Sequence, residues 1–256
     1  MLLAIDIGNT NIVFGCFKDS EILFRERCAT SQRSTPLEYA SVLMSAFGLH
    51  GVDPAGITGA VISSVVPSVT ATVKSAVEKL SGVKVMVVGP GIKTGLSILI
   101  DNPAQLGSDL VVGAVAGINE YSVPQIIIDM GTATTFSVID RNRSFQGGII
   151  MTGMAVSSDA LTNKTSQLPR IAFEKPKKVI GTNTVDSMKS GIMFGTASTI
   201  DGMIERIENE LGEKCTVIAT GGLASTVIPL CKRDIILDDD LLLKGLLLIY
   251  SKNCKD

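Results

Sequence analysis

The sequence predicts an α/β protein built from two related halves. Two observations support this prediction: segments typical of strands and of helices alternate along the 256 residues, and one strand–turn–strand motif occurs twice, about half a chain apart. Hydrophobic residues make up 45% of the chain and charged residues 19%, which is enough apolar material for a large core. We therefore expect two lobes, residues 1–115 and 116–256, each with a mixed sheet flanked by helices, and a cleft between the lobes.

The first half alternates between short apolar strands and helices. Apolar and β-branched residues at 2–7 and 12–17 indicate two strands joined by a Gly-Asn-Thr-Asn turn. Residues 37–49 carry apolar side chains at helical intervals. The pattern then predicts, in order, a buried strand at 59–68, a helix at 73–80 and a strand at 83–88. A further helix is expected to start at Ser108, with Asp109 in its first turn.

The second half repeats this alternation. A second strand–turn–strand spans residues 125–141, and a strand that ends in a glycine turn follows at 143–153. The remaining pattern predicts a helix at 154–166, a long amphipathic helix at 185–211, a strand leading into a glycine-rich turn at 216–225, and a final helix.

Composition narrows the class of partner. The net charge is −2, from 23 basic and 25 acidic residues, so the chain lacks the electrostatic signature of a nucleic-acid-binding protein. The five cysteines have no zinc-binding spacing and no signal peptide precedes them, which indicates reduced thiols in the cytoplasm. The most apolar stretch, residues 241–250, contains a lysine and is too short to span a bilayer. We expect a cytoplasmic protein with a small-molecule substrate, and neither a nucleic acid nor a membrane as partner.

The duplicated motif has the chemistry of a phosphate-binding turn. Residues 5–11 read Ile-Asp-Ile-Gly-Asn-Thr-Asn, and residues 128–134 read Ile-Asp-Met-Gly-Thr-Ala-Thr. Glycine lets the backbone approach phosphate oxygens, and backbone N–H groups with Thr and Asn side chains donate hydrogen bonds to them. The carboxylates of Asp6 and Asp129 would hold or water-bridge a cation that offsets the phosphate charge. One copy alone would favour a plain β-hairpin, whereas two copies favour phosphate binding.

A third element, the Gly-Gly turn within residues 219–225, follows a predicted strand. By itself this turn is typical of an ordinary strand–helix connection. Together with the two Asp turns, it completes the order of phosphate-1, phosphate-2 and adenosine motifs. In this the chain resembles the actin-like ATPase superfamily, whose two lobes have a ribonuclease H-like fold.

From end to end the chain is more specifically similar to the type III pantothenate kinase family. The matching segments are Asp-Ile-Gly-Asn-Thr-Asn at 6–11, Asp-Asn-Pro at 101–103, Gly-Ser-Asp at 107–109, Asp-Met-Gly-Thr-Ala-Thr-Thr-Phe at 129–136, Gly-Gly at 147–148, Leu-Pro-Arg at 168–170, Gly-Thr-Asn-Thr at 181–184, Ala-Thr-Gly-Gly-Leu-Ala at 219–224 and the closing segment 238–250. The resemblance implies ATP-dependent phosphorylation of pantothenate, the first step of coenzyme A biosynthesis, by a homodimer. It also implies Mg²⁺ and an activating monovalent cation, K⁺ or NH₄⁺.

The resemblance assigns roles to individual residues. The ATP-binding residues would be Asp6, Ile7, Gly8, Asn9, Thr10, Asn11, Ile12, Val13 and Thr132. The substrate contacts would be Gly107, Ser108, Asp109, Leu110 and Thr184. Asp129 corresponds to the ligand of the monovalent cation, and Asp109 corresponds to the catalytic base.

Asp109 suits that role chemically, because phosphoryl transfer needs a group that takes the proton of the acceptor hydroxyl as the new bond forms. Considered without the resemblance, Asp109 is equally well explained as an acid at a helix N-terminus, where the helix dipole stabilises it. His50, the only histidine, follows a helix, and we expect it at the surface. We likewise expect a solvated turn at residues 238–240 and a solvated basic loop at 174–178.

The sequence departs from the family on the acceptor side. The usual motif is Gly-Ala-Asp-Arg, whereas residues 107–110 read Gly-Ser-Asp-Leu. Leu110 cannot make the charge-assisted contact of an arginine with a carboxylate, and that loss costs on the order of a few kcal/mol. Further departures are Ile100 for tyrosine, Ser137 for aspartate and Thr152 for proline.

Three hypotheses therefore remain open. The chain is an active pantothenate kinase with compensated acceptor binding, a non-catalytic relative that binds nucleotide and acts through a partner, or an actin-like kinase for a small acceptor without a carboxylate. Leu110 is the feature that discriminates between them, because an apolar residue there suits an uncharged acceptor.

Overall fold

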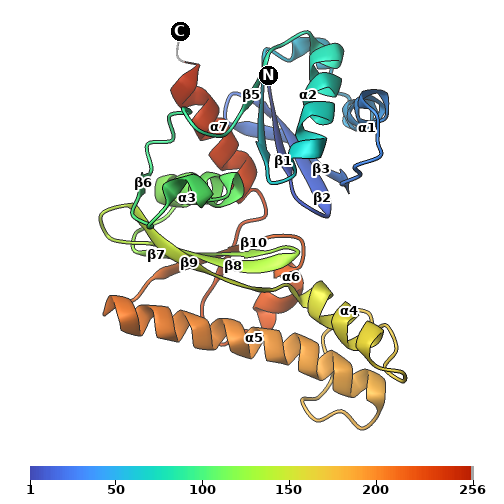
Figure 1. The fold of residues 1–256 in the computed structure, drawn as a ribbon, viewed down its shortest axis with the longest axis vertical. Helices are drawn as coiled ribbons and strands as arrows, with labels where there is room; N and C mark the ends of the chain where they lie inside the picture. The colour runs from blue at the N-terminus through green and yellow to red at the C-terminus, as the bar shows by residue number, and fades with distance from the viewer. Residues whose placement is uncertain (255–256) are drawn as a thin grey trace. The chain divides into compact units, whose positions relative to one another are not determined.

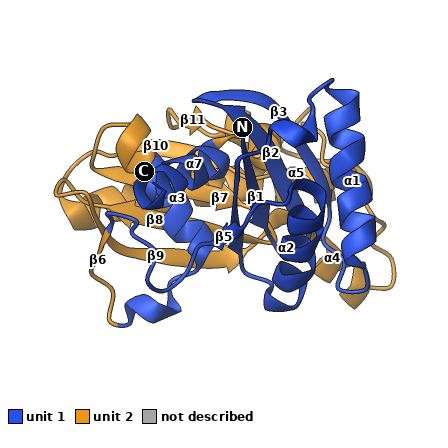
Figure 2. Cartoon of the chain, turned by 90° about the horizontal axis from the view of Figure 1, so that it is seen from above, with its two compact units in different colours: residues 1–96, 102–116, 241–256 blue, residues 97–101, 117–240 orange. Residues whose placement is uncertain are grey.

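A computed structural model describes residues 1–254 and divides the chain into two compact units (Figure 2). Unit 1 comprises residues 1–96, 102–116 and the described part of 241–256, and unit 2 comprises residues 97–101 and 117–240. The sequence predicted a single division after residue 115. The structure divides the chain within a helix, between Ala116 and Gly117, and the final helix packs in unit 1 although it follows unit 2 in sequence.

Unit 1 holds a five-stranded mixed sheet (Figure 1). Its elements are β1 (Leu2–Ile7), β2 (Asn11–Lys18), β3 (Glu21–Ala29), α1 (Pro36–Leu49), η1 (Pro54–Gly56), β4 (Gly59–Ser64), α2 (Pro67–Ser81), β5 (Val85–Val87), η2 (Pro103–Gln105), the first nine residues of α3 (Ser108–Glu120) and α7 (Leu241–Asn253). The strand order is β3-β2-β1-β4-β5. The first three strands are antiparallel neighbours, whereas β4 and β5 run parallel to β1.

Unit 2 holds a six-stranded mixed sheet. Its elements are β6 (Ser97–Ile98), β7 (Gln125–Met130), β8 (Ala133–Ile139), β9 (Ser144–Thr152), α4 (Met154–Lys164), α5 (Thr184–Leu211), β10 (Thr216–Thr220), α6 (Ala224–Val227), η3 (Ile228–Leu230) and β11 (Ile236–Leu237). Strands β9-β8-β7-β10-β11 repeat the order and directions of β3-β2-β1-β4-β5, and β6 extends the sheet beside β9. The expectation of two mixed sheets flanked by helices is confirmed.

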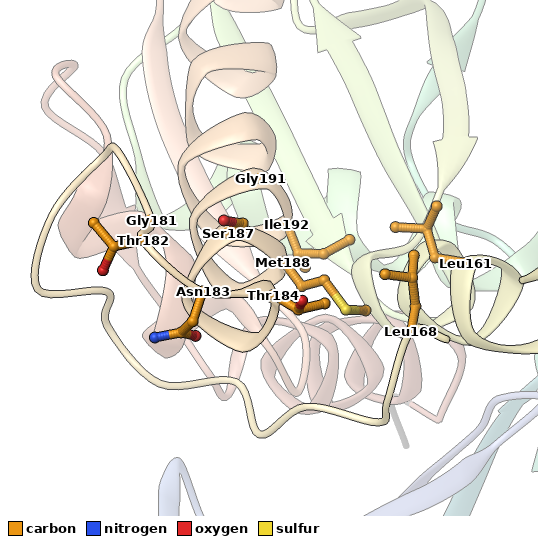
Figure 3. Close-up of a pocket in the computed structure, with 10 residues that line it drawn as sticks. All are labelled: Leu161, Leu168, Gly181, Thr182, Asn183, Thr184, Ser187, Met188, Gly191 and Ile192. Carbon is orange, nitrogen blue, oxygen red and sulfur yellow. The ribbon is translucent and has the colours of Figure 1, made fainter. Parts of the chain in front are cut away.

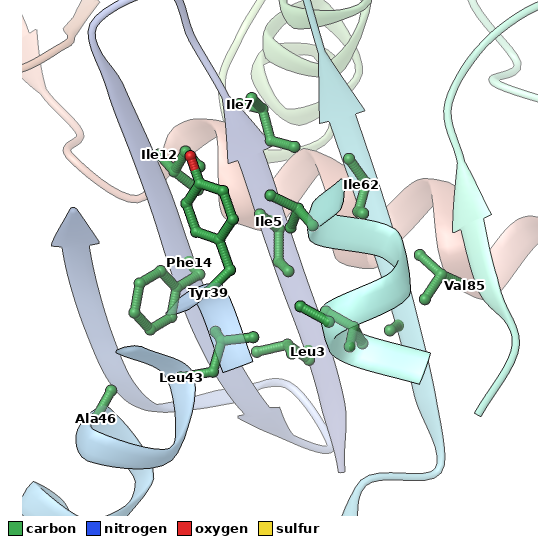
Figure 4. Packing of buried hydrophobic residues seen from close by; sticks show 14 of the residues in the cluster. Leu3, Ile5, Ile7, Ile12, Phe14, Tyr39, Leu43, Ala46, Ile62 and Val85 are labelled. Atoms are coloured by element: carbon green, nitrogen blue, oxygen red, sulfur yellow. The ribbon is translucent and has the colours of Figure 1, made fainter. Parts of the chain in front are cut away.

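Burial on both faces explains why β1 is apolar along its length. Leu3, Ile5 and Ile7 face a core that α1 and α2 complete, with Tyr39 and Leu43 from α1 (Figure 4). The alternate residues of β1 face a second cluster, which includes Leu2, Ala4, Val112, Val115, Leu243, Leu246 and Ile249. Because side chains alternate along a strand, Asp6 continues the face of Leu2 and Ala4 at the carboxyl end of β1.

The core of unit 2 is covered mainly by α5, the long helix coloured orange in Figure 1. Ile126, Ile128 and Met130 of β7 pack against the apolar side of α5, which presents Met193, Ala197, Ile200 and Ile204. Helix α5 begins at the N-cap Asn183, whose side chain accepts a hydrogen bond from the backbone N–H of Asp186. Asp129 again occupies the alternate face at the end of its strand.

Three strands were not predicted from the sequence, namely the nine-residue β3 and the two-residue β6 and β11. Within residues 1–254, no helix combines the length and the apolar character that a transmembrane segment requires.

Candidate nucleotide and acceptor sites

The first Asp turn lies at the end of the β1–β2 hairpin. Ile7 pairs with Ile12, so residues 8–11 form the turn, and the N–H of Gly8 donates to the carbonyl oxygen of Asn11 at 3.0 Å. The side chains of Asn9, Thr10 and Asn11 are exposed. The turn therefore presents polar side chains and a glycine at the carboxyl edge of the sheet, where ligands bind in open α/β sheets.

Residues 107–110, the Gly-Ser-Asp-Leu segment, are bonded to the same edge of the sheet in unit 1. Strand β4 is parallel to β1, and Asp6 pairs with Ser63 in the register. The hydroxyl of Ser108, at the start of α3, lies 3.0 Å from the hydroxyl of Ser63. It also accepts from the N–H of Ser64 at 3.1 Å and donates to the Ser64 carbonyl at 3.1 Å. These bonds tie the first turn of α3 to the strand beside Asp6.

Asp109 is partly buried in this first turn, and its Oδ1 accepts a hydrogen bond from the N–H of Leu110 at 2.9 Å. Burial raises the pKa of Asp109, and backbone hydrogen bonds lower it only in part. Within residues 1–254, no lysine or arginine forms an ion pair with this carboxylate. A side chain at position 107 would collide with Oδ1, so Gly107 is needed for this placement. A carboxylate with a raised pKa is a better proton acceptor than an ordinary aspartate.

The second Asp turn lies between β7 and β8. Met130 pairs with Thr134, and the N–H of Gly131 donates to the carbonyl of Ala133 at 3.0 Å, so this turn is one residue shorter than the first. Thr132 is exposed at its tip. The N–H of Gly153, which follows β9, donates to the Thr132 carbonyl at 3.0 Å.

The Gly-Gly turn of the third motif lies beside Asp129. Thr220 pairs with Asp129 across β10 and β7, and Gly221 follows with φ of +98°. A Cβ at Gly221 would lie 2.6 Å from Asp129 Oδ1 and equally close to the N–H nitrogen of Met130. Only glycine fits this backbone conformation and this approach without strain. The structure thus brings the second and third motifs together within unit 2.

Few side chains at the second Asp turn could serve as ligands for a cation. No cluster of three His, Cys, Asp or Glu side chains that could hold a metal ion occurs within the described residues. Gly221 packs so closely against the Asp129 carboxylate and the Met130 backbone that a Cβ there would collide with both. Asp129 is the one acidic residue of this turn, so backbone, water or nucleotide oxygens would have to complete the shell of a cation bound to it, which suits a weakly bound cation with oxygen ligands.

Thr184 is the first residue of α5 and lines an open pocket of about 730 Å³ in unit 2 (Figure 3). The other lining residues are Leu161, Leu168, Gly181, Thr182, Asn183, Ser187, Met188, Gly191 and Ile192. Leu161 and Leu168 lie across from Met188 and Ile192 in the figure, and the Thr and Asn side chains lie at the N-terminus of the helix. The pocket therefore combines an apolar wall with polar groups.

The aspartate run at residues 238–240 differs from its prediction. Asp238 is 6% exposed, and the hydroxyl of Tyr121 donates to its Oδ2 at 2.7 Å. The N–H of Asp240 donates to Asp238 Oδ1 at 3.1 Å. The expected solvated turn is wrong for Asp238, because a helix end brings a tyrosine from a distant part of the sequence against it.

Residues that form hydrogen bonds with the predicted site segments were not identified from the sequence. Ser63 and Ser64 end a strand that was predicted, and two consecutive serines after Gly-Ala-Val-Ile were an available signal. Thr30 contacts the first Asp turn but follows β3, a strand that was not predicted.

Comparisons with known proteins identify relatives along most of the chain. The family model described as type III pantothenate kinase matches residues 2–206. A type III pantothenate kinase from Halalkalibacterium halodurans is 45% identical over 253 residues, which cover 99% of this chain and 100% of that protein. Another, from Brevibacillus brevis, is 42% identical over 253 residues, covering 99% of each chain.

A solved structure resembles the chain in fold. Component A of (R)-2-hydroxyglutaryl-CoA dehydratase from Acidaminococcus fermentans has a TM-score of 0.59 and 16% sequence identity, and the match covers 99% of both chains. At this identity the likeness shows the fold alone. A putative 2-dehydro-3-deoxygalactonokinase from Sinorhizobium meliloti also matches in fold, with a TM-score of 0.56 and 13% identity over 100% of this chain and 98% of that chain. The expected actin-like fold is confirmed by these neighbours.

Proposed function

The chain belongs to the type III pantothenate kinase family, and on this basis we propose that it transfers the γ-phosphoryl group of ATP to the hydroxyl of pantothenate. The product is 4′-phosphopantothenate, and the reaction is the first step of coenzyme A biosynthesis. We further propose that it works in the cytoplasm as a homodimer. The observation within the structure that carries this proposal is Asp109, a desolvated carboxylate without a cationic partner in the described residues. It lies in the first turn of α3, which Ser108 ties to the strand beside Asp6.

Asp109 acts as the base in this proposal. It accepts the proton of the pantothenate hydroxyl while that oxygen forms its bond to the γ-phosphorus and the bond from phosphorus to ADP breaks. The raised pKa supports this role, because it increases the proton affinity of the carboxylate. Gly107 and the network around Ser108 support it as well, because they fix where the carboxylate lies.

The two Asp turns bind the nucleotide. The segment from Asp6 to Val13 and the exposed Thr132 bind the ATP phosphates, with backbone N–H groups and the Thr and Asn side chains as hydrogen-bond donors. The Asp6 carboxylate would hold or water-bridge a cation, and Mg²⁺ would supply charge neutralisation to the phosphates when it is bound. Asp129 is the ligand for K⁺ or NH₄⁺. Gly107, Ser108, Asp109, Leu110 and Thr184 contact pantothenate, with Ser108 contributing through its backbone, since its hydroxyl is engaged with Ser63 and Ser64.

A second candidate, a kinase for an acceptor without a carboxylate, is favoured by Leu110. This half-buried apolar side chain stands where the family usually has an arginine. A third candidate is a nucleotide-binding protein without turnover.

A coupled assay with ATP, Mg²⁺, K⁺ and pantothenate tests the proposal. We expect ADP release that depends on pantothenate, and we expect Asp109→Asn to lower kcat by about 10²–10⁴-fold, because the base is removed while the shape is kept. The exposed Asp234→Asn is a matched control that should leave kcat unchanged.

The same assay separates the alternatives. Pantothenyl alcohol carries an alcohol in place of the carboxylate. A kcat/KM for this analogue above that for pantothenate would favour the uncharged acceptor. Nucleotide binding without turnover on either compound would overturn the kinase function and leave a nucleotide-binding role.

A further inference from the structure

Thr30 holds two carbonyl groups of the first Asp turn. It directly follows β3, and Ala29 pairs with Asn11 across the sheet, so Thr30 lies beside the turn. Its hydroxyl donates to the carbonyl oxygen of Gly8 at 2.7 Å, and its N–H donates to the carbonyl oxygen of Thr10 at 2.9 Å. The site residues predicted from the sequence do not include Thr30.

The orientation of these carbonyls determines what the turn presents to an anion. In a trans peptide the C=O of one residue and the N–H of the next point in opposite directions. Fixing the Gly8 carbonyl toward Thr30 therefore directs the N–H of Asn9 away from Thr30, and Asn9 is exposed. Carbonyl oxygens repel phosphate oxygens, whereas N–H groups attract them. A peptide that flipped at Gly8 would replace a donor by an acceptor.

Ser31, the residue that follows Thr30, is hydrogen-bonded to a side chain of the core. The N–H of Ser31 donates to the hydroxyl of Tyr39 at 2.9 Å, and that hydroxyl donates to the Ser31 carbonyl at 3.0 Å. Tyr39 is 5% exposed in the cluster between the sheet and α1, and its hydroxyl points toward the Ile12 end of β2 (Figure 4). The residue after Thr30 is thus bonded twice to a buried side chain, which limits the movement of Thr30 itself.

We propose that Thr30 is a positioning residue for nucleotide binding: its hydroxyl holds the Gly8 peptide so that the turn presents N–H groups to the phosphates. This inference rests on the proposed ATP-binding role of residues 6–13. It concerns ground-state binding of the nucleotide, and binding of pantothenate does not depend on it.

The test measures the dissociation constant of a non-hydrolysable ATP analogue with Mg²⁺ by calorimetry, in the absence of pantothenate. Thr30→Val keeps the branched shape and removes the hydroxyl, and we expect it to weaken binding about tenfold. Thr30→Ser keeps the donor and should stay within about threefold of the wild type. The KM for pantothenate should be unchanged in both variants.

Thr199→Val is the matched control. The hydroxyl of Thr199 also donates to a backbone carbonyl, that of Gly195 at 2.8 Å, but on an exposed face of α5. We expect no change in nucleotide affinity for this variant. If Thr30→Val does not fold, Thr30→Cys replaces it in the comparison with Thr30→Ser, because a thiol is a much weaker donor of similar size.

Three results would overturn the inference: Thr30→Val binds as well as Thr199→Val, Thr30→Ser binds as poorly as Thr30→Val, or the KM for pantothenate rises as much as the nucleotide dissociation constant. Wild-type binding of the analogue without turnover would overturn the kinase function alone, and the variants would still decide the role of Thr30. A wild type that binds no nucleotide would overturn both.

Discussion

Burial disfavours the ionised form of both Asp109 and Glu208, yet the pKa values of these two carboxyl groups shift in opposite directions. Burial raises the pKa of Asp109 in unit 1, and only backbone N–H groups oppose this effect. Burial also raises the pKa of Glu208 in unit 2, but hydrogen bonds from Arg233 at 2.5 Å, from Lys214 at 2.7 Å and from the N–H of Cys215 at 3.2 Å outweigh it. The net result is a pKa below the usual glutamate range.

The difference separates an acid whose charge is compensated from one whose charge is not. Glu208 is 4% exposed and joins the end of α5 to the segment that carries Arg233, so its charge is fully compensated. Asp109 has no such compensation among the described residues, which costs stability and increases proton affinity. Groups whose pKa is perturbed without a compensating charge are found preferentially at functional sites, so the contrast is in keeping with the base proposed at Asp109 and not with such a role for Glu208.

The largest effect on stability is expected for Glu208→Gln. The variant keeps the shape of the side chain but weakens the charge-assisted bonds to Arg233 and Lys214. We expect a loss of about 1–3 kcal/mol in the free energy of unfolding at pH 7, measured by urea denaturation.

The pH dependence provides the control for this variant. A carboxyl group whose pKa is lowered by folding stabilises the protein above its unfolded pKa, and this contribution is lost as the pH falls through the folded pKa. The gap between wild type and Glu208→Gln should therefore narrow below the usual glutamate pKa of about 4.3. A gap that stays constant down to acid pH would show that the charge is not its source.

An effect of opposite sign and intermediate size is expected for Asp109→Asn. Because folding raises the pKa of Asp109, the wild type loses stability as the pH rises from the usual aspartate pKa of about 3.9 through the folded value. The variant has no such loss and should be more stable at pH 7 by about 0.5–2 kcal/mol, as often occurs when an active-site charge is removed. Thermal unfolding at pH 7 and at acid pH measures this gain. A variant less stable than wild type at pH 7 would contradict an uncompensated charge at this position.

The smallest effect is expected for Arg141→Gln. Arg141 forms an ion pair with Glu213 at 2.9 Å, but its side chain is 69% exposed. Exposed pairs contribute about 0–1 kcal/mol, so urea denaturation should detect a change of about 0.5 kcal/mol or less. A loss as large as that of Glu208→Gln would mean that burial does not distinguish the two ion pairs.

The main elements of the fold could be predicted because they depend on local patterns. Most of the apolar strands, the amphipathic helix at 184–211 and the two Asp turns appear in the sequence with the expected spacing. The strand expected at 59–68 was too long: β4 ends at Ser64, and α2 already begins at Pro67, which suits the first turn of a helix. Strand β3 was not predicted because its residues, Glu-Ile-Leu-Phe-Arg-Glu-Arg-Cys-Ala, include several charged side chains on a partly exposed edge strand. The short strands β6 and β11 have only two residues each, too few for any periodicity.

The sequence by itself determined the duplicated motif, the order of the three nucleotide motifs and the unusual acceptor segment Gly-Ser-Asp-Leu. Each of these features consists of residues close together in the chain, and the residue types by themselves indicate the chemistry. Only the tertiary structure decided that the final helix packs in unit 1, that Ser108 bonds to Ser63 and that Thr30 holds the first turn. These contacts join residues far apart in sequence. They arise from strand register and from the burial of polar groups that must find hydrogen-bond partners, and local spacing does not encode either.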